Sequence, residues 1–263
     1  VWARKPRRAL VTAPTFAEYA TALESVGCTV ERFFLREQED FAVTDAFCAA
    51  IRPGVDMVFL CQPNNPTGQL TALPLVEQIL HRCAACGTLL VVDECFLDFL
   101  PDHALHTAKG LLGEGDLVIL KAFTKLYGMA GVRLGYALSA DTALLEQMQA
   151  CGQPWGVSSL AQAAGLAALE ETAYVEKVRA LIAEQRPRLT AGLRALGLRV
   201  LEGRANYLLF RAPEALGEAL RQRGAVLRSC ANYPGLGPGW YRTAVRTGPE
   251  NEQLLKLLAE VLE

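Results

Sequence analysis

The sequence of 263 residues lacks the features that mark membrane, fibrous and disordered chains. Its longest uncharged stretches, residues 57–76 and 150–169, are interrupted by Pro, Gly, Asn, Gln and Ser, so neither predicts a membrane span. No secretory hydrophobic segment opens the chain, and no internal repeat is present. Glycine (22) and proline (13) fall short of a low-complexity bias, and hydrophobic residues make up 51%, so we expect an ordinary globular chain.

The sequence also lacks an excess of charge of either sign. Twenty-six Lys and Arg stand against 28 Asp and Glu, which gives a formal net charge of -2. Such a chain has no general field for nucleic acid or for an anionic membrane, and we predict neither as a partner. Any anion that the protein binds must therefore be held by a local group of residues.

Paired cysteines are scarce. Eight cysteines are scattered along the chain, and this pattern is typical of small buried side chains in a reducing cytoplasm. Only Cys83 and Cys86 form a CxxC motif, and the one nearby candidate ligand, His81, falls on the same helical pattern. Because a tetrahedral zinc site needs two further ligands, the pattern favours an ordinary helix, and we predict no metal site.

What is present, up to about residue 140, is an alternation of short apolar runs with helical stretches. Continuous apolar runs indicate strands that are covered on both faces, as in a parallel sheet. We therefore expect an α/β domain in three layers, with a mainly parallel sheet flanked by helices. The runs are residues 9–12, 55–61, 88–92, 117–120 and 134–138.

The second half of the chain has a different pattern. Helical spacing over residues 158–170 and 174–196 predicts two helices, the longer of which bridges two bodies. We expect residues 1–168 to form the large domain, and residues 169–263 to form the connecting helix and a small α+β domain. The predicted strands of the small domain are residues 198–201, 207–210, 226–228 and 241–245, and its predicted helices are residues 213–223 and 249–262. Residues 232–239 are rich in Gly and Pro, and we expect them to form an irregular loop of defined shape next to the functional site.

Polar residues follow three of the strands in the large domain. Residues 63–68 (PNNPTG) follow one strand, Asp93 ends the next, and Lys125 follows a third, with Arg133 eight residues later. Each has an ordinary interpretation alone, as a turn, a helix cap or a solvated side chain. Ligands of open α/β sheets bind outside the carboxyl ends of the strands, so together these residues predict one site.

These residue types suit pyridoxal phosphate. The Lys125 amine can form a Schiff base with an aldehyde, and the Asp93 carboxylate can keep a pyridine nitrogen protonated. Thr124 and Arg133 can donate to a phosphate. Phe16 follows the first strand and can cover the pyridine face, although plain core packing explains it equally well.

The same motifs carry a resemblance that extends along essentially the whole chain. Their spacing is similar to that of the fold-type I pyridoxal phosphate enzymes of the class I/II aminotransferase family. The residues concerned are 63–68, 93–99 and 124–136. Within the family, the second half looks most like the threonine-phosphate decarboxylases of cobalamin biosynthesis, which are related to the histidinol-phosphate aminotransferases. The segments behind this likeness are 153–162, 204–209 and 228–236.

Carried over by position, the resemblance implies roles for five residues. Lys125 would bind the cofactor covalently, and Asp93 would pair with its ring nitrogen. Asn65 would donate to the phenolic oxygen, and Thr124 and Arg133 would bind the phosphate.

On the substrate side, the resemblance implies that Arg242 grips the α-carboxylate, and we expect Asn65 to bind the substrate as well. Arg228, together with Arg246, can bind a second phosphate on a small phosphorylated amino acid, although a surface arginine or a salt bridge explains each equally well. We favour decarboxylation of such a substrate over transamination. An aminotransferase acting on histidinol phosphate or a related amino acid remains the alternative.

The sequence departs from the family pattern in three ways. Phe96 stands where many aminotransferases have Tyr, and Ala122 stands where a phosphate-binding Ser is frequent. Family members also begin several tens of residues earlier, with a Gly-rich turn and a helix N-terminus that bind the cofactor phosphate. We therefore expect these 263 residues to be part of a longer, homodimeric enzyme and to bind that phosphate weakly or not at all by themselves.

Two other classes remain open. A truncated, catalytically impaired fragment that acts only as an interaction module would tolerate replacement of Lys125 and Asp93. A Rossmann-type nucleotide binder is disfavoured because no GxGxxG motif follows a strand.

Overall fold

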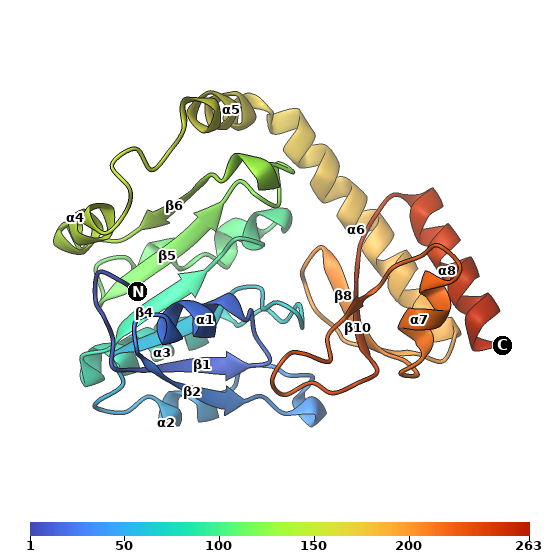
Figure 1. Cartoon of the computed structure of the whole chain (residues 1–263), viewed down its shortest axis with the longest axis horizontal. Coiled ribbons are helices and arrows are strands. Elements are labelled where there is room, and N and C mark those ends of the chain that lie inside the picture. The colour runs from blue at the N-terminus through green and yellow to red at the C-terminus, as the bar shows by residue number, and fades with distance from the viewer.

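Two β-sheets joined by one long helix organise the chain, and the computed structural model describes residues 1–263 (Figure 1). The large sheet has the strand order β2-β1-β3-β4-β5-β6, and the small sheet has the order β7-β8-β10-β9. All neighbours in the large sheet are parallel except β5 and β6, and the small sheet is antiparallel. The predicted mainly parallel α/β fold with a separate small sheet is confirmed.

The strands are β1 (Arg8–Ala13), β2 (Thr29–Phe34), β3 (Met57–Cys61), β4 (Leu89–Asp93), β5 (Leu117–Ala122), β6 (Gly135–Leu138), β7 (Arg199–Val200), β8 (Tyr207–Arg211), β9 (Arg228–Ser229) and β10 (Trp240–Ala244). The α-helices are α1 (Glu18–Glu24), α2 (Ala46–Ala50), α3 (Leu73–Cys86), α4 (Thr142–Ala150), α5 (Ser159–Glu170), α6 (Thr172–Ala195), α7 (Leu216–Arg221) and α8 (Gly248–Leu262). Short 3-10 helices cover Glu37–Glu39, Leu97–Phe99, His103–Leu105, Ala108–Leu111 and Ala130–Val132.

The core lies on both faces of the large sheet. On one face, Val58 and Val92 of the central strands pack with Leu80 of α3. On the other face, the neighbouring strand residues pack with Leu23 of α1 and Leu144 of α4. Side chains alternate between the faces of a strand, so a strand covered on both sides must be apolar at every position. This explains why the predicted continuous runs are strands.

One strand of the large sheet, β2, was not predicted. It pairs only with β1 and forms an edge of the sheet. Its sequence, TVERFF, contains two charged residues, and all six of its side chains are half-buried or exposed. An edge strand needs no continuous apolar run, so the pattern used to find the other strands does not detect it.

The long helix α6 leads from α5 to the small sheet (Figure 1). Its 24 residues span about 36 Å at the α-helical rise. Leu189 and Leu193 of α6 pack with Phe210 of β8 and Leu258 of α8 in the core of the small sheet. The helix lies between the two sheets, where the sequence predicted it. The domain boundary between residues 168 and 169 stays a prediction.

The loop after β3 packs against the segment before β8. The Arg204 N–H donates to the carbonyl oxygen of Gly68 at 2.6 Å, and the Tyr207 hydroxyl donates to that of Asn64 at 3.0 Å. A Cβ atom at Gly203 would lie 2.7 Å from the Gly68 carbonyl, which is closer than any side chain tolerates. Glycine at position 203 therefore lets the two parts of the chain meet next to the predicted site.

The cysteines are all free, and Cys83 and Cys86 lie within α3 as the helix interpretation predicted. Four cysteines are buried, but Cys151 is exposed, so the expectation that they are all small buried side chains is wrong there. Cys151 follows the last residue of α4, where the chain runs over the surface. No helix combines the length and apolar character needed to cross a membrane.

Buried charges tie β5 to the segment after β4. The Lys121 Nζ atom lies 3.0 Å from the carboxylate of Glu94 and 2.9 Å from that of Asp98. Glu94 is completely buried and also accepts from the Thr107 hydroxyl and the Ala108 N–H. Burial alone would lower the pKa of Lys121, but the carboxylates of Glu94 and Asp98 outweigh it and the pKa is raised.

Replacing Lys121 should destabilise the protein strongly. In Lys121→Met the Glu94 carboxylate stays buried without its cation, so we expect the free energy of unfolding in urea to fall by about 3 kcal/mol. Because the folded-state pKa of Lys121 is raised, the difference from the wild type should be complete at neutral pH and shrink as the pH rises beyond about 10.4. Lys109→Met, at an exposed lysine, is the control, and equal stability of Lys121→Met and the wild type would contradict the prediction.

Candidate active site

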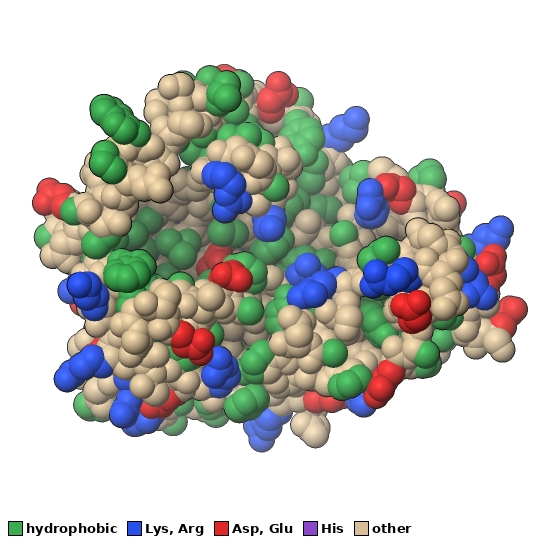
Figure 2. All heavy atoms as spheres, viewed as in Figure 1, with side chains coloured by type: hydrophobic (Ala, Val, Ile, Leu, Met, Phe, Trp, Pro, Cys, Tyr) green, Lys and Arg blue, Asp and Glu red, His purple; other side chains and the backbone are tan.

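The carboxyl ends of β3, β4 and β5 lie at one edge of the large sheet. In the parallel register, Asp93 at the end of β4 pairs with Cys61 of β3 and Leu120 of β5. Thr124 and Lys125 follow directly after β5. Figure 2 shows the molecule hollowed in this view, with apolar side chains in its depth and Lys and Arg side chains near it. Pairing of neighbouring parallel strands thus brings together residues that are far apart in sequence.

A cavity of about 330 Å³ opens at this edge, and we call it the lysine cavity. Its volume lies in the range of small-molecule sites. All six residues predicted to bind the cofactor line it: Phe16, Asn65, Asp93, Thr124, Lys125 and Arg133. The cavity is also lined by Tyr19, Cys61, Cys95, Phe96 and Ala122.

Two donors hold the Asp93 carboxylate. Its Oδ1 atom accepts from the Cys95 N–H at 2.9 Å, and its Oδ2 atom accepts from the Tyr19 hydroxyl at 2.5 Å. The Tyr19 ring stacks on Phe59 with centroids 5.0 Å apart and meets Phe16 edge-on at 5.5 Å. Burial, with the nearby Cys61 and Asp93, raises the pKa of Tyr19 well above its usual value, so this hydroxyl remains a protonated donor.

The two lysines at the end of β5 have opposite surroundings. Lys121 is buried and paired with carboxylates, as described above. Lys125 is exposed to the cavity, makes no ion pair, and has its Nζ atom 5.7 Å from the centroid of the Phe96 ring. The Phe96 ring in turn packs edge-on against Tyr207 at 5.2 Å. Lys125 is therefore the amine available for covalent chemistry.

The small sheet contributes Arg242 to the same region. Its Nη1 atom donates to Asn65 Oδ1 through a short hydrogen bond, and its guanidinium lies 5.0 Å from the centroid of the Tyr207 ring. The Tyr233 hydroxyl also approaches Asn65 Oδ1, at 3.5 Å. Because the amide oxygen is occupied by these donors, the Asn65 NH₂ group is free to donate to a ligand oxygen.

A second cavity, of about 600 Å³, adjoins the first, and we call it the arginine cavity. Lys125 and Phe96 line both cavities, so the two meet at the lysine. Its basic residues are Lys125, Arg223, Arg228, Arg242 and Arg246. Its one acidic residue, Glu250, pairs with Arg246 at 2.6 Å. A cavity with this balance of charge suits an anionic ligand.

The predicted substrate residues differ in how firmly they are held. Arg228 donates to Asn232 Oδ1 at 3.2 Å and lies over the Tyr233 ring at 5.7 Å, but it forms no ion pair and its charge remains available. The Arg246 guanidinium is partly neutralised by the exposed pair with Glu250. Both of them line the arginine cavity.

The residues of the lysine cavity fit the cofactor that the sequence suggests. An amine without an ion pair, a fixed carboxylate, a hydroxyl and a guanidinium surround one space, as a pyridine aldehyde that carries a phosphate requires. Phe16 lies at the wall, half exposed, where it can contact a ring. This fit comes from the chemistry of the donors, and the individual roles remain predictions.

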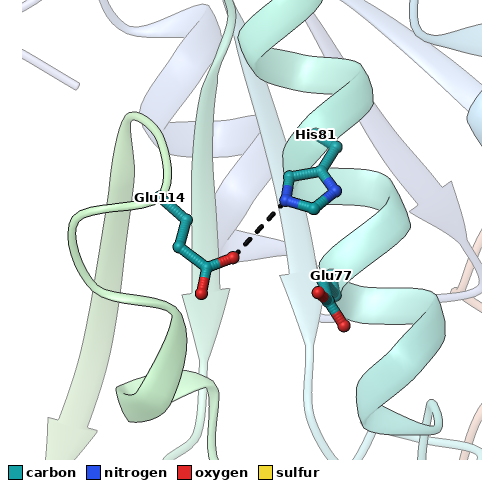
Figure 3. A group of neighbouring side chains, drawn as sticks. All are labelled: Glu77, His81 and Glu114. Carbon is teal, nitrogen blue, oxygen red and sulfur yellow. Dashed lines mark ion pairs between the residues drawn. The ribbon is translucent and has the colours of Figure 1, made fainter.

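Three possible metal ligands gather elsewhere (Figure 3). Glu77 and His81 are one turn apart on α3, and Glu114 precedes β5, with its carboxylate 3.4 Å from His81 Nε2. The amino end of β5 is at the edge of the sheet opposite the two cavities. Because His81 and Glu114 are about half exposed, a solvated surface ion pair accounts for their geometry.

Sequence reasoning missed three residues of the site. Tyr19 lies three positions after Phe16, the spacing at which residues of a helix share a face, and this signal could have found it. Tyr207 begins an apolar strand and carries no such signal. Arg223 ends a helical pattern, and only the fold of the small domain brings it to the arginine cavity.

Comparison with known proteins agrees with this geometry. Residues 1–261 match the family model of aminotransferase class I and II. The chain is 40% identical over 262 residues to the threonine-phosphate decarboxylase of Salmonella typhimurium, covering 98% of this chain and 72% of that protein. It is 34% identical over 254 residues to the histidinol-phosphate aminotransferase of Lactiplantibacillus plantarum, covering 95% and 69%.

A solved structure shows the same architecture. The histidinol-phosphate aminotransferase from Clostridium acetobutylicum superposes with a TM-score of 0.92 at 26% identity, covering 99% of this chain and 79% of that one. Class I and II aminotransferases depend on pyridoxal phosphate, the cofactor expected from the residues of the lysine cavity. The chain belongs to the class I and II aminotransferase family of pyridoxal phosphate enzymes.

Proposed function

We propose that this protein decarboxylates an O-phosphorylated amino acid, with L-threonine O-3-phosphate as the substrate and (R)-1-aminopropan-2-yl phosphate as the product. The observation that carries the proposal is the junction of the two cavities at Lys125, one suited to the cofactor and the other rich in arginine. The similarity to a threonine-phosphate decarboxylase supports it. The product would then serve cobalamin biosynthesis.

In this proposal, five residues of the lysine cavity hold pyridoxal phosphate. Lys125 binds its aldehyde carbon, and Asp93 pairs with its ring nitrogen. The Asn65 NH₂ group donates a hydrogen bond to the phenolic oxygen. It is free to do so because Arg242 contacts the amide oxygen of Asn65 and not its NH₂ group. Thr124 and Arg133 donate to the phosphate.

The arginines orient the substrate. Arg242 binds the α-carboxylate and Arg228 binds the substrate phosphate, so the α-carbon lies near Lys125. When bound, pyridoxal phosphate supplies an electron sink for the electron pair that remains at the α-carbon after a bond breaks. The bond between the α-carbon and the carboxylate carbon would break and CO₂ would leave, and the Lys125 side chain in its ammonium form would give one proton to the α-carbon and become the neutral amine.

A pyridoxal phosphate aminotransferase is the second candidate. Its support is the similarity to the histidinol-phosphate aminotransferase of Lactiplantibacillus plantarum. Both reactions need the same cofactor residues and differ in which bond of the α-carbon is broken. A basic cavity for a phosphorylated substrate therefore serves either. The amino-group acceptor separates them experimentally.

We also propose that the protein forms a homodimer. Large apolar side chains of the segment around α5 are exposed, among them Trp155 at 92%, Leu160 at 82% and Leu166 at 69%. Clusters of exposed large apolar residues are typical of protein interfaces. A second copy of the chain, as in other members of the family, is the partner we infer.

The first prediction concerns Lys125. Incubation with pyridoxal phosphate followed by borohydride should attach the cofactor to this lysine, because its amine has no carboxylate partner and opens into the cavity. Peptide mass spectrometry locates the label. Lys125→Ala should abolish labelling in the cavity, and Lys109→Ala, at an exposed lysine, should leave it unchanged. Labelling only at other lysines would contradict the cofactor site.

The second prediction concerns the reaction. With threonine phosphate, the holoenzyme should release CO₂ without any added keto acid. Transfer of the amino group to 2-oxoglutarate, with no CO₂, would instead establish the aminotransferase.

In the same assay, Arg228→Gln should raise the KM for threonine phosphate at least about tenfold and change kcat little, because a charge-assisted contact to the phosphate is lost. Arg188→Gln is the control, since Arg188 lies on the exposed side of α6 and pairs with Glu184. An unchanged KM in Arg228→Gln would exclude Arg228 from the phosphate site.

The third prediction concerns the dimer. Light scattering of the purified protein should give twice the mass of one chain. Leu160→Glu should shift the protein toward one chain mass, because it places a charge in an apolar interface. Leu105→Glu, at an exposed leucine outside this segment, should leave the mass unchanged. A wild type with the mass of a single chain would contradict the proposal.

A further inference from the structure

We propose that the Tyr19 hydroxyl is a positioning group that fixes the Asp93 carboxylate and stabilises its negative charge toward the cofactor's ring nitrogen. The inference rests on the proposed function, in which Asp93 pairs with that nitrogen. The juxtaposition that supports it is the 2.5 Å contact between the Tyr19 hydroxyl and Asp93 Oδ2.

The Tyr19 ring is held in place by its neighbours. The side chain is buried, stacks on Phe59 and is met edge-on by Phe16. It also belongs to the apolar core that covers one face of the sheet, together with Leu23 of the same helix. A buried ring that is stacked on one neighbour and met edge-on by another holds its hydroxyl in one direction, and here that direction is the carboxylate of Asp93.

The two donors to Asp93 divide its oxygen atoms between them. The Cys95 N–H binds Oδ1, and the Tyr19 hydroxyl binds Oδ2. A carboxylate offers about four lone pairs, so two remain for a ligand. Hydrogen bonds to an ionised acceptor are roughly twice as strong as neutral ones, so the hydroxyl stabilises the charged form in surroundings that are largely apolar.

The neighbouring groups do not compete for this role. Cys61 and Cys95 line the same cavity, and burial raises the pKa of both thiols, to about 12 for Cys61. They are therefore neutral near pH 7. The cation of the adjacent strand, Lys121, is engaged with the carboxylates of Glu94 and Asp98 instead. A protonated thiol is only a weak donor, so the Tyr19 hydroxyl is the stronger side-chain donor to Asp93.

Tyr19→Phe tests the inference because it removes the hydroxyl and keeps the ring. The readout is the concentration of pyridoxal phosphate that gives half-maximal borohydride labelling of Lys125, which does not depend on turnover. We expect this concentration to rise about tenfold, as for loss of a hydrogen bond to a charged group. A carbocyclic analogue, with C–H in place of the ring nitrogen, should show no change between wild type and Tyr19→Phe.

Two further variants separate positioning from general stability. Tyr241→Phe removes a buried hydroxyl that donates to the Glu214 carbonyl in the small domain, and it should leave both half-maximal concentrations unchanged. In an Asp93→Asn background, Tyr19→Phe should have no further effect on labelling by pyridoxal phosphate, because the two residues act through one contact.

Three outcomes would overturn the inference. Equal labelling of wild type and Tyr19→Phe by pyridoxal phosphate would remove the role, while the labelling of Lys125 itself would still support the proposed function. An equal loss for pyridoxal phosphate and for the carbocyclic analogue would mean that Tyr19 only maintains the fold. Absence of Lys125 labelling in the wild type would overturn the proposed function, and this inference with it.

Discussion

Parallel pairing of β4 with β5 is the constraint on which the rest of the site depends. Asp93 ends one strand and Lys125 follows the other, so the register of this pair determines that both line a single cavity. The buried contacts of Lys121 with Glu94 and Asp98 secure the two ends. A charge buried in this way is costly to leave unpaired, so a shift of one strand against the other would carry a large penalty.

The same pairing separates two chemically identical side chains. Lys121 and Lys125 are close in sequence. The first is neutralised by carboxylates in the interior, whereas the second lines a cavity. An amine held between carboxylates stays protonated and unreactive, whereas an amine without such partners is accessible to an aldehyde. One lysine thus holds the structure together, and the other is open to the cavity.

The small sheet completes the site by supplying positive charge. Arg242 comes from β10 and contacts Asn65, which follows β3 of the large sheet. Further arginines of the small domain line the adjoining cavity. The chain as a whole carries a net charge of -2, so the positive charge at this cavity comes from a local concentration of guanidinium groups and not from an overall field.

The sequence by itself determined the local features of this protein. Its continuous apolar runs predicted the buried strands, its helical spacing predicted α6, and its motifs after the strands predicted a shared site with Asp93 and Lys125. The predictions of the strands and of α6 succeed because burial acts on short stretches of chain. Asp93 and Lys125 line one cavity because parallel strands end at one edge of the sheet, and the site itself stays a prediction. The strand β2 escaped prediction because an edge strand does not need a continuous apolar sequence.

Only the tertiary structure decided which side chains meet across long separations. The hydrogen bond of Tyr19 with Asp93 joins residues 74 positions apart, and the contact of Arg242 with Asn65 joins residues 177 positions apart. It also decided that Lys121 is buried and that Cys151 is exposed. Composition and periodicity indicate which face of its own helix or strand a residue lies on. The contacts named here depend on how helices and strands pack on one another, and that packing is a property of the whole chain.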